Sequence, residues 1–235
     1  RRLSEDRRFF SYFHPALEDE PIIFVQVALT KGLGKSIQEL MKPSIGDQTK
    51  YDTATFYSIS NCQEGLSRVT LGNFLIKRVI YEIQEELPHI KNFGTLSPIP
   101  GFVDWFSYLE QNKIKNILKN LPDQDLSFLK SKNLKIGDNR ILLNKDAIMK
   151  LVIHYINNEK NHKGLPINEV SRFHLGNGAI VDDIVINANI SEIGFKRSFG
   201  VMVNYLYELK NIEKNHEDYI NNKKVIISNK LKKYL

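Results

Sequence analysis

Cysteine is nearly absent from this sequence, which has one, Cys62, among its 235 residues. A single cysteine excludes an intramolecular disulfide and argues against the cysteine-rich clusters that hold structural zinc. The six histidines contain no His-Glu-x-x-His pair, which argues against a zinc hydrolase. Long apolar runs are missing too, because the longest candidate, residues 22–29, falls well short of the roughly 20 residues that cross a bilayer.

The composition otherwise favours a globular protein, since 42% of the residues are hydrophobic and can form a sizeable core. The formal net charge of +6 favours anionic partners such as nucleic acid, lipid or a phosphorylated cofactor. Much of this excess lies near the C-terminus, where we expect a solvated tail: Lys223, Lys224, Lys230, Lys232 and Lys233. The charge alone therefore selects no partner, and no RNA-binding or recognition-helix motif supports a nucleic-acid binder.

Strand-like and helix-like segments alternate along the chain, which predicts a mixed α/β (α+β) fold with a largely antiparallel or mixed sheet. Ser36 and Glu39 have the spacing of a capping box for a short helix. The clearest strands are expected at residues 8–13, 22–30, 53–60 and 90–96, with further strands in 170–190 around a loop at 174–179. The clearest helices are expected at residues 71–87, 102–109, 146–158 and 198–209.

The junction between the strand at 53–60 and the helix at 71–87 is a candidate phosphate site. The start of a helix exposes free backbone N–H groups and the positive end of its dipole, and both favour phosphate. Gly65 and Gly72 allow close approach, and Arg68 adds a positive charge. Glycine-bearing turns of this kind are common, so a plain turn remains the alternative on these residues alone.

Two side chains could carry chemistry. His174 stands beside a Gly-Asn-Gly turn, and Ser97 is followed by Pro98 and Pro100, whose rigid geometry can present a hydroxyl to a cleft. Ser97 does not lie in a Gly-x-Ser-x-Gly elbow, which argues against an α/β-hydrolase. A structural histidine and an ordinary serine turn are the alternatives for these two residues.

Three blocks of sequence resemble the malonyl-CoA decarboxylases. The first is Phe-Tyr-Ser-Ile-Ser at 56–60 with Leu-Gly-Asn-Phe-Leu-Ile-Lys-Arg at 71–78. The second is Thr-Leu-Ser-Pro-Ile-Pro-Gly-Phe at 95–102. The third is Phe-His-Leu-Gly-Asn-Gly-Ala at 173–179, with Gly-Val-Met-Val-Asn-Tyr-Leu-Tyr downstream at 200–207. The resemblance covers most of residues 8–209.

The resemblance implies the catalytic domain of that family, with the fold of the GNAT acetyltransferases: a mixed, mostly antiparallel sheet flanked by helices. Residues 1–235 would form this domain, and the family's N-terminal helical domain would lie outside the chain. The implied reaction converts malonyl-CoA to acetyl-CoA and CO2 without a cofactor, because the CoA thioester is itself the substrate.

The resemblance also assigns roles to residues. Ser97 and His174 fall on the catalytic serine and histidine, the pair that would orient the malonyl carboxylate and protonate the enolate. Ser58 and Tyr207 fall on supporting positions of the active site. The CoA-binding loop falls on Ser67, Arg68, Val69, Thr70, Leu71, Gly72 and Asn73. Thr70 stands where some members of the family have a glutamate.

The expected partners are malonyl-CoA and acetyl-CoA, with neither nucleic acid nor membrane, in a possible homo-oligomer. We expect a cytoplasmic protein or one in an organelle lumen, mitochondrial or peroxisomal in a eukaryote, although the C-terminus is not Ser-Lys-Leu. Two other functions remain open: an acyl-CoA-dependent acyltransferase of the GNAT type, which needs an acceptor, and a CoA-binding domain without catalysis.

Overall fold

The computed structural model describes residues 4–15, 20–42, 48–62, 72–119, 121, 126–131 and 134–235. Its strands are β1 (Arg7–Phe13), β2 (Pro21–Thr30), β3 (Thr53–Asn61), β4 (Asn92–Thr95), β5 (Ser97–Pro98), β6 (Ile180–Val185) and β7 (Met202–Leu206). Its α-helices are α1 (Ile37–Leu40), α2 (Gly72–Glu86), α3 (Phe102–Tyr108), α4 (Gln111–Leu118), α5 (Asn139–Leu143), α6 (Lys145–Asn157), α7 (Glu169–Gly176), α8 (Glu192–Ser198) and α9 (Ile212–Asn222). Short 3-10 turns are η1 (Gln48–Lys50), η3 (Ser127–Lys130) and η4 (Asn229–Tyr234).

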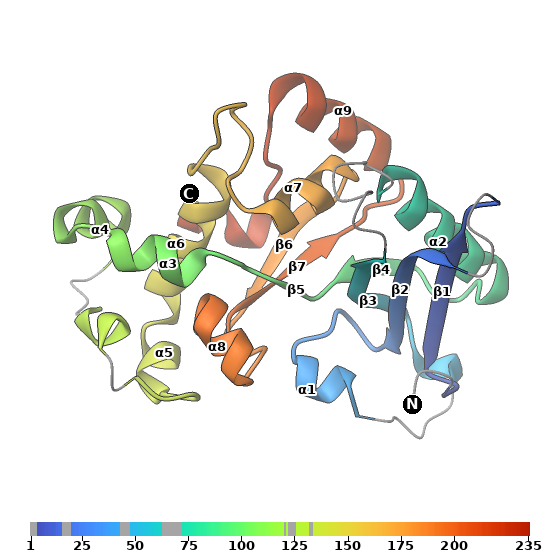
Figure 1. Ribbon diagram of the computed structural model, residues 1–235, viewed down its shortest axis with the longest axis horizontal. Helices are drawn as coiled ribbons and strands as arrows, with labels where there is room; N and C mark the ends of the chain where they lie inside the picture. The colour runs from blue at the N-terminus through green and yellow to red at the C-terminus, as the bar shows by residue number, and fades with distance from the viewer. Residues whose placement is uncertain are drawn as a thin grey trace.

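The strands described here form one 7-stranded sheet in the order β1-β2-β3-β4-β7-β5, with β6 on the other side of β7. All pairs are antiparallel except β3 with β4. Figure 1 shows β1, β2 and β3 at one end with α2 beside them, and α3 to α6 gathered at the opposite end. The mixed, mostly antiparallel sheet flanked by helices confirms the fold class predicted from the sequence.

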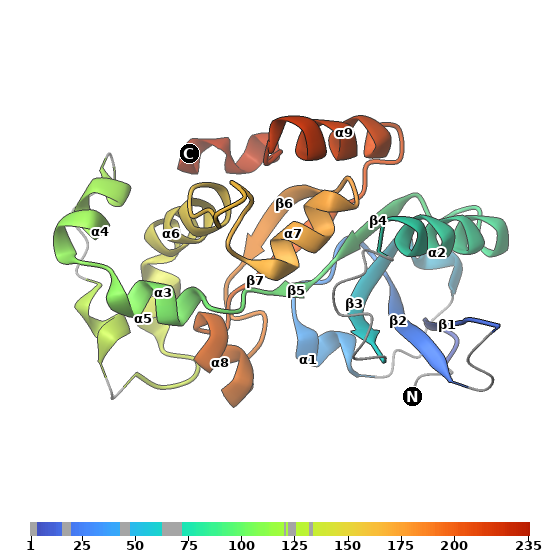
Figure 2. The same cartoon turned by 45° about the horizontal axis from the view of Figure 1, so that its top comes forward.

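The two faces of the sheet are buried to different extents. The larger core joins the sheet to α2, α6, α7 and α9, and it contains Val203, Tyr205 and Tyr207. A smaller cluster on the other face packs α1 against Ala28, Leu96 and Met202. Figures 1 and 2 both show α7 lying across β6 and β7, on the larger core. The alternating side chains of β7 thus divide between the two faces, as a strand requires.

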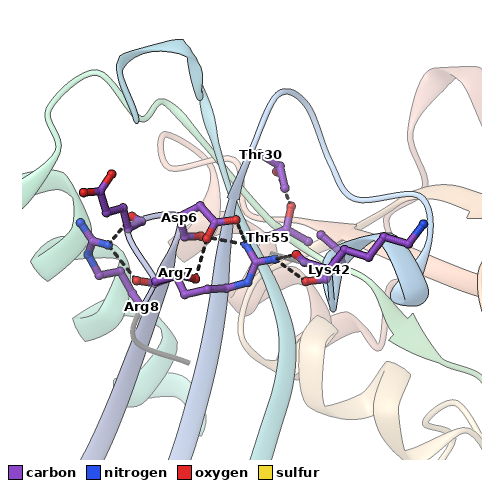
Figure 3. A network of polar contacts seen from close by, with 9 residues as sticks. Asp6, Arg7, Arg8, Thr30, Lys42 and Thr55 are labelled. Carbon is purple, nitrogen blue, oxygen red and sulfur yellow. Dashed lines mark hydrogen bonds and ion pairs between the residues drawn. The ribbon is translucent and has the colours of Figure 1, made fainter. Parts of the chain in front are cut away.

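Polar contacts of Arg7 and Arg8 join strand β1 to the ends of α1 and α2 (Figure 3). The buried guanidinium of Arg7 bonds Asp6 Oδ2 at 2.5 Å and donates to the carbonyl of Lys42 at 2.8 Å, just beyond the end of α1. It also donates to the carbonyl of Leu40, so a cation satisfies acceptors at the C-terminal end of this short helix. Arg8 pairs with Glu86 at the end of α2.

The structure corrects two predicted elements. The segment 170–176 is helix α7 and not a strand, because the Asn168 side chain caps it by accepting a hydrogen bond from Ser171 N. His174 therefore lies on a helix and not in a loop. The predicted helix at 198–209 is also wrong: Phe199 and Gly200 have positive φ and end α8, and strand β7 follows.

The C-terminal segment differs from the solvated tail predicted above. Ile227, Leu231 and Tyr234 are buried, and Ile227 forms a bridge with Val181 of β6. Lys230 pairs with Asp182 at 2.7 Å. The lysines of this segment are exposed, while apolar residues between them are buried.

Two further findings bear on the sequence predictions. The capping box is confirmed on its N-cap side, since Ser36 accepts from Glu39 N at the start of α1. No helix within the described ranges is both long and apolar enough to cross a membrane.

Candidate active site

Ser97 lies on the two-residue strand β5, at the end of the strand order, where it pairs with Val203 of β7. It is 5% exposed, and its hydroxyl donates to Thr95 Oγ1 at 2.8 Å. The sequence predicted a turn here, but the chain stays extended through residue 98 because β7 supplies backbone partners. The two prolines still limit this pairing, since a proline nitrogen cannot donate a hydrogen bond.

His174 lies on α7, which packs on the larger core of the sheet, and its side chain contacts Ser97. The distance from His174 Nε2 to Ser97 Oγ is 2.9 Å, and the distance from Nδ1 to Tyr207 Oη is also 2.9 Å. The Tyr205 ring stacks on the imidazole at 4.6 Å between centroids. The structure therefore brings together Ser97, His174 and Tyr207, three residues that the sequence assigned to one site.

The hydrogen bonds fix the tautomer of His174. The one hydrogen of the Ser97 hydroxyl goes to Thr95, so Ser97 Oγ accepts from a protonated Nε2. In a neutral ring Nδ1 is then the acceptor, and Tyr207 Oη donates to it. This arrangement satisfies the Tyr207 hydroxyl, which has no other hydrogen-bond acceptor among the described residues and would be costly to bury unpaired. The donors Tyr207, His174 and Ser97 thus point in one direction, toward Thr95, which accepts the last hydrogen bond.

Burial sets the charge state of this chain. Desolvation lowers the pKa of His174 from 6.5 to about 3, so the imidazole is neutral at physiological pH. Burial also raises the pKa of Tyr207 well above 10, and the negative neighbour that an ionised Tyr205 would present raises it further. Tyr207 therefore keeps the proton that it donates to the ring.

Ser58 lies apart from this cluster. It pairs with Gln26 of β2, whereas Phe56 pairs with Val27, and a register shift separates the two pairs. Residues directly opposite in an antiparallel pair share a face, so Ser58 and Phe56 lie on opposite faces. Phe56 is the one that contacts Tyr207, with ring centroids 6.2 Å apart. The supporting role of Ser58 stays a prediction.

Ser58 and Ser97 are nevertheless placed on two strands that separate. The parallel pairing of β3 with β4 ends at Phe56 with Thr95, followed by a hydrogen bond from Leu96 N to Phe56 O. Beyond that bond no strand pairing joins β3 to β5 among the described residues, and β5 bonds only to β7 among the strands described. The two serines thus stand just past the point where the sheet opens.

Most of the predicted CoA-binding loop, Ser67, Arg68, Val69, Thr70 and Leu71, lies outside the described residues. Gly72 and Asn73 form the first residues of α2, directly after that loop. Their place at a helix start agrees with the predicted strand-to-helix junction.

Sequence reasoning missed several polar residues that support the site. Thr95 accepts the Ser97 hydroxyl, and Asn204 donates to the Thr95 carbonyl at 2.8 Å from the other face of the sheet. Ser171 contacts Tyr205 Oη at 2.7 Å. The alternation of Val203, Tyr205 and Tyr207 was a signal for a strand facing this site, but the segment was read as a helix.

No group of three metal-binding side chains occurs among the residues that the structure describes. A pocket of about 390 Å³ lies between α4, α6 and the C-terminal segment, and its lining includes Lys113, Lys150 and His154. Ser97 and His174 do not line this pocket, so it is separate from the candidate active site.

Comparison with known proteins gives the family. The profile described as "Malonyl-CoA decarboxylase C-terminal domain" matches residues 1–235. The chain is 36% identical to the mitochondrial malonyl-CoA decarboxylase of Anser anser anser over 96% of its own length and 49% of that protein. It is 33% identical to the mitochondrial enzyme of Rattus norvegicus over 98% of its own length and 51% of that protein. The chain thus spans about half the length of the curated relatives it matches.

Solved structures agree with the sequence matches. The malonyl-CoA decarboxylase of Rhodopseudomonas palustris superposes with a TM-score of 0.85 at 39% identity, covering 97% of this chain and 53% of that one. The loading GNATL domain of CurA from Lyngbya majuscula superposes with a TM-score of 0.50 at 13% identity, covering 84% of this chain and 74% of that one. The second likeness shows the fold alone, which is GNAT-like. The chain belongs to the malonyl-CoA decarboxylase family.

Proposed function

We propose that the protein converts malonyl-CoA to acetyl-CoA and CO2, with Ser97 and His174 at the reacting centre. The observation that carries this proposal is the buried hydrogen-bonded chain from Tyr207 through His174 to Ser97, at the point where two parallel strands separate. It is supported by the name of the relatives that share a third or more of its residues over nearly its whole length.

Loss of CO2 leaves negative charge on the α-carbon and the thioester oxygen of the substrate. The thioester delocalises this charge itself, so we propose that the reaction needs no cofactor. The protein has to orient the carboxylate, present hydrogen-bond donors to the developing charge, and then protonate carbon. Ser97 can do the second of these when its hydroxyl turns from Thr95 to the substrate.

The proton reaches carbon along the donor chain. Ser97 protonates the α-carbon, the Nε2 proton of His174 passes to Ser97 Oγ, and the Tyr207 proton passes to Nδ1. The negative charge of the enolate then resides on Tyr207 Oη. As the product leaves, Nδ1 returns its proton to Tyr207 and water reprotonates Nε2 through Ser97 Oγ, which restores the starting tautomer and releases hydroxide. The transfer runs downhill because a carbon next to a thioester is a far weaker acid than a phenol, even one whose pKa is raised.

The proposed site of the CoA moiety is the loop before α2. We propose that residues 67–73 bind its phosphates through the backbone N–H groups at the start of the helix, aided by the Arg68 guanidinium. The supporting role of Ser58 in the active site is part of the same proposal. Residues 1–235 act as one catalytic domain, in the cytoplasm or in an organelle lumen such as the mitochondrial one named for two of the relatives. We also propose that the protein forms a homo-oligomer and that it binds neither nucleic acid nor a membrane.

The test is to incubate the purified protein with malonyl-CoA and no acceptor, and to quantify acetyl-CoA and CO2. Release of both in equal amounts supports the proposal. Turnover that requires an added amine would instead indicate an acyltransferase. Saturable binding of malonyl-CoA without CO2 release would indicate a binding domain, and either of these results would overturn the proposal.

A further inference from the structure

Ser97 and His174 are far apart in the sequence, so their 2.9 Å contact depends on how two separate segments are held together. Ser97 begins the segment 97–101, which starts as strand β5 and ends in a turn, and His174 lies on α7, outside the sheet. Only one other hydrogen bond joins residues 97–101 to α7 and its cap, and both segments are fully described. In this bond, Asn168 Nδ2 donates to the carbonyl of Pro100 at 2.9 Å.

Asn168 uses both ends of its amide. Its oxygen accepts from Ser171 N at 2.8 Å, which caps α7, and from Ser171 Oγ at 2.9 Å. Ser171 Oγ in turn contacts Tyr205 Oη at 2.7 Å, and the Tyr205 ring stacks on His174. The Asn168 side chain therefore touches the serine segment directly and reaches the histidine through the helix cap and through Tyr205.

Burial makes this link rigid. Asn168 is 2% exposed and Ser171 is fully buried, so water does not compete for their hydrogen bonds. A second donor, Tyr155 Oη from α6, reaches the same Pro100 carbonyl at 3.0 Å. Tyr155 fixes the serine segment to α6, and its hydroxyl also contacts the Asn168 side chain. Of the two donors on this carbonyl, Asn168 is the one that also caps α7 through Ser171.

We propose that Asn168 is a positioning residue for the reaction, holding α7 against the serine segment so that Ser97 and His174 stay in hydrogen-bond contact. This inference rests on the proposed function. An amide fits this role, because serine or aspartate can cap a helix equally well but neither donates from the position of Nδ2.

The test compares Asn168→Ser with Tyr155→Phe in the purified protein. Asn168→Ser keeps a helix-capping oxygen and loses the bond to Pro100, and Tyr155→Phe loses the other bond to the same carbonyl. A displacement of about 1 Å at a reacting group costs on the order of 100-fold in rate, so we expect kcat to fall about 10- to 100-fold in Asn168→Ser. KM should stay within about threefold, because CoA binds elsewhere, and Tyr155→Phe should keep kcat within about threefold.

A second readout does not depend on turnover. In ¹⁵N-histidine-labelled protein, the Nε2–H signal of His174, identified by its loss in His174→Asn, should shift or broaden in Asn168→Ser and not in Tyr155→Phe. An unchanged signal together with unchanged kcat would overturn the inference, as would equal losses in both variants or unfolding of Asn168→Ser at the assay temperature. Absence of turnover in the wild-type protein would refute the proposed function instead, and the ¹⁵N comparison would still test the positioning.

Discussion

At the scale of single residues, His174 is neutral because both of its ring nitrogens are enclosed by protein. Its 4% exposure leaves almost no water to solvate an imidazolium, and its two hydrogen-bond partners are hydroxyl groups without charge. In the proposed reaction the ring relays a proton, taking one at Nδ1 as it gives one at Nε2. This proposed role depends on the position of the ring, with Tyr205 packed on one face.

The burial of His174 makes the protein less stable in acid. The unfolded chain takes up a proton on this ring as the pH falls below 6.5, whereas the folded protein does not until about pH 3. The free energy of unfolding therefore falls with decreasing pH in this window, by up to about 1.4 kcal/mol per pH unit from this residue. We expect His174→Asn to show a shallower decline, measured by urea unfolding between pH 7 and pH 4. Equal slopes in the two proteins would contradict the assignment.

Tyr207 is the terminal donor of the chain, so its hydroxyl should matter for turnover and little for CoA affinity. Tyr207→Phe leaves Nδ1 without a donor, and we expect kcat to fall by about 100-fold or more, as for loss of a general acid. Steady-state kinetics with malonyl-CoA measure this, and Tyr108→Phe serves as control because Tyr108 is 87% exposed on α3. A kcat equal to that of the control would show that Tyr207 transfers no proton.

At the scale of elements, the segments that position the site are the ones the sequence described least well. β1, β2 and β3 were predicted closely, because alternating apolar residues bounded by turn residues describe a strand directly. α7 was missed because β-branched and aromatic residues such as Val170 and Phe173 suggested a strand. The Asn168 cap and the tertiary packing of α7 on β6 and β7 outweigh that weak preference.

β7 shows the opposite error. Residues 202–206 were assigned to a helix, although Val203, Tyr205 and Tyr207 alternate with Met202 and Asn204. The positive φ of Phe199 and Gly200, which separates α8 from this strand, cannot be read from a phenylalanine. The pairing of Ser97, His174 and Tyr207 followed from the family resemblance, whereas Thr95 and Asn168 became visible only through hydrogen bonds between distant segments.

The turn that follows α7 packs closely against the start of α9. Gly178 has a φ of 78°, and a Cβ there would lie 2.2 Å from the carbonyl oxygen of Ile212 at the start of α9. Gly137 has nearly the same φ, 76°, with nothing within 4 Å. Gly137→Ala should thus cost only the backbone strain of about 1–2 kcal/mol. Gly178→Ala should cost clearly more in urea unfolding, and equal costs would contradict the close contact of α7 with α9.

At the scale of the whole molecule, the C-terminal segment carries much of the positive charge and also contributes buried residues to the core. Leu231 is 1% exposed between lysines that remain in water. We expect Leu231→Ala to lower the free energy of unfolding by about 2–5 kcal/mol, as for other core leucines. Lys232→Ala should change it by less than about 0.5 kcal/mol, as for an exposed residue. Similar small effects in both variants, measured by urea unfolding, would contradict this packing and support the solvated tail predicted from the sequence.

The molecule as a whole places one enclosed donor chain beside the opening between β3 and β5, and the family to which it belongs is defined over the entire chain. The central claim is that this donor chain performs the decarboxylation. If this claim is right, activity depends on His174 itself, and replacing another histidine leaves activity unchanged.

The most direct measurement compares CO2 release from malonyl-CoA by the wild-type protein, His174→Asn and His162→Asn, since His162 is exposed. The account predicts that wild type and His162→Asn turn over equally. It predicts that His174→Asn loses about 100- to 10,000-fold in kcat while it still binds CoA. Turnover by His174→Asn at the wild-type rate would contradict it.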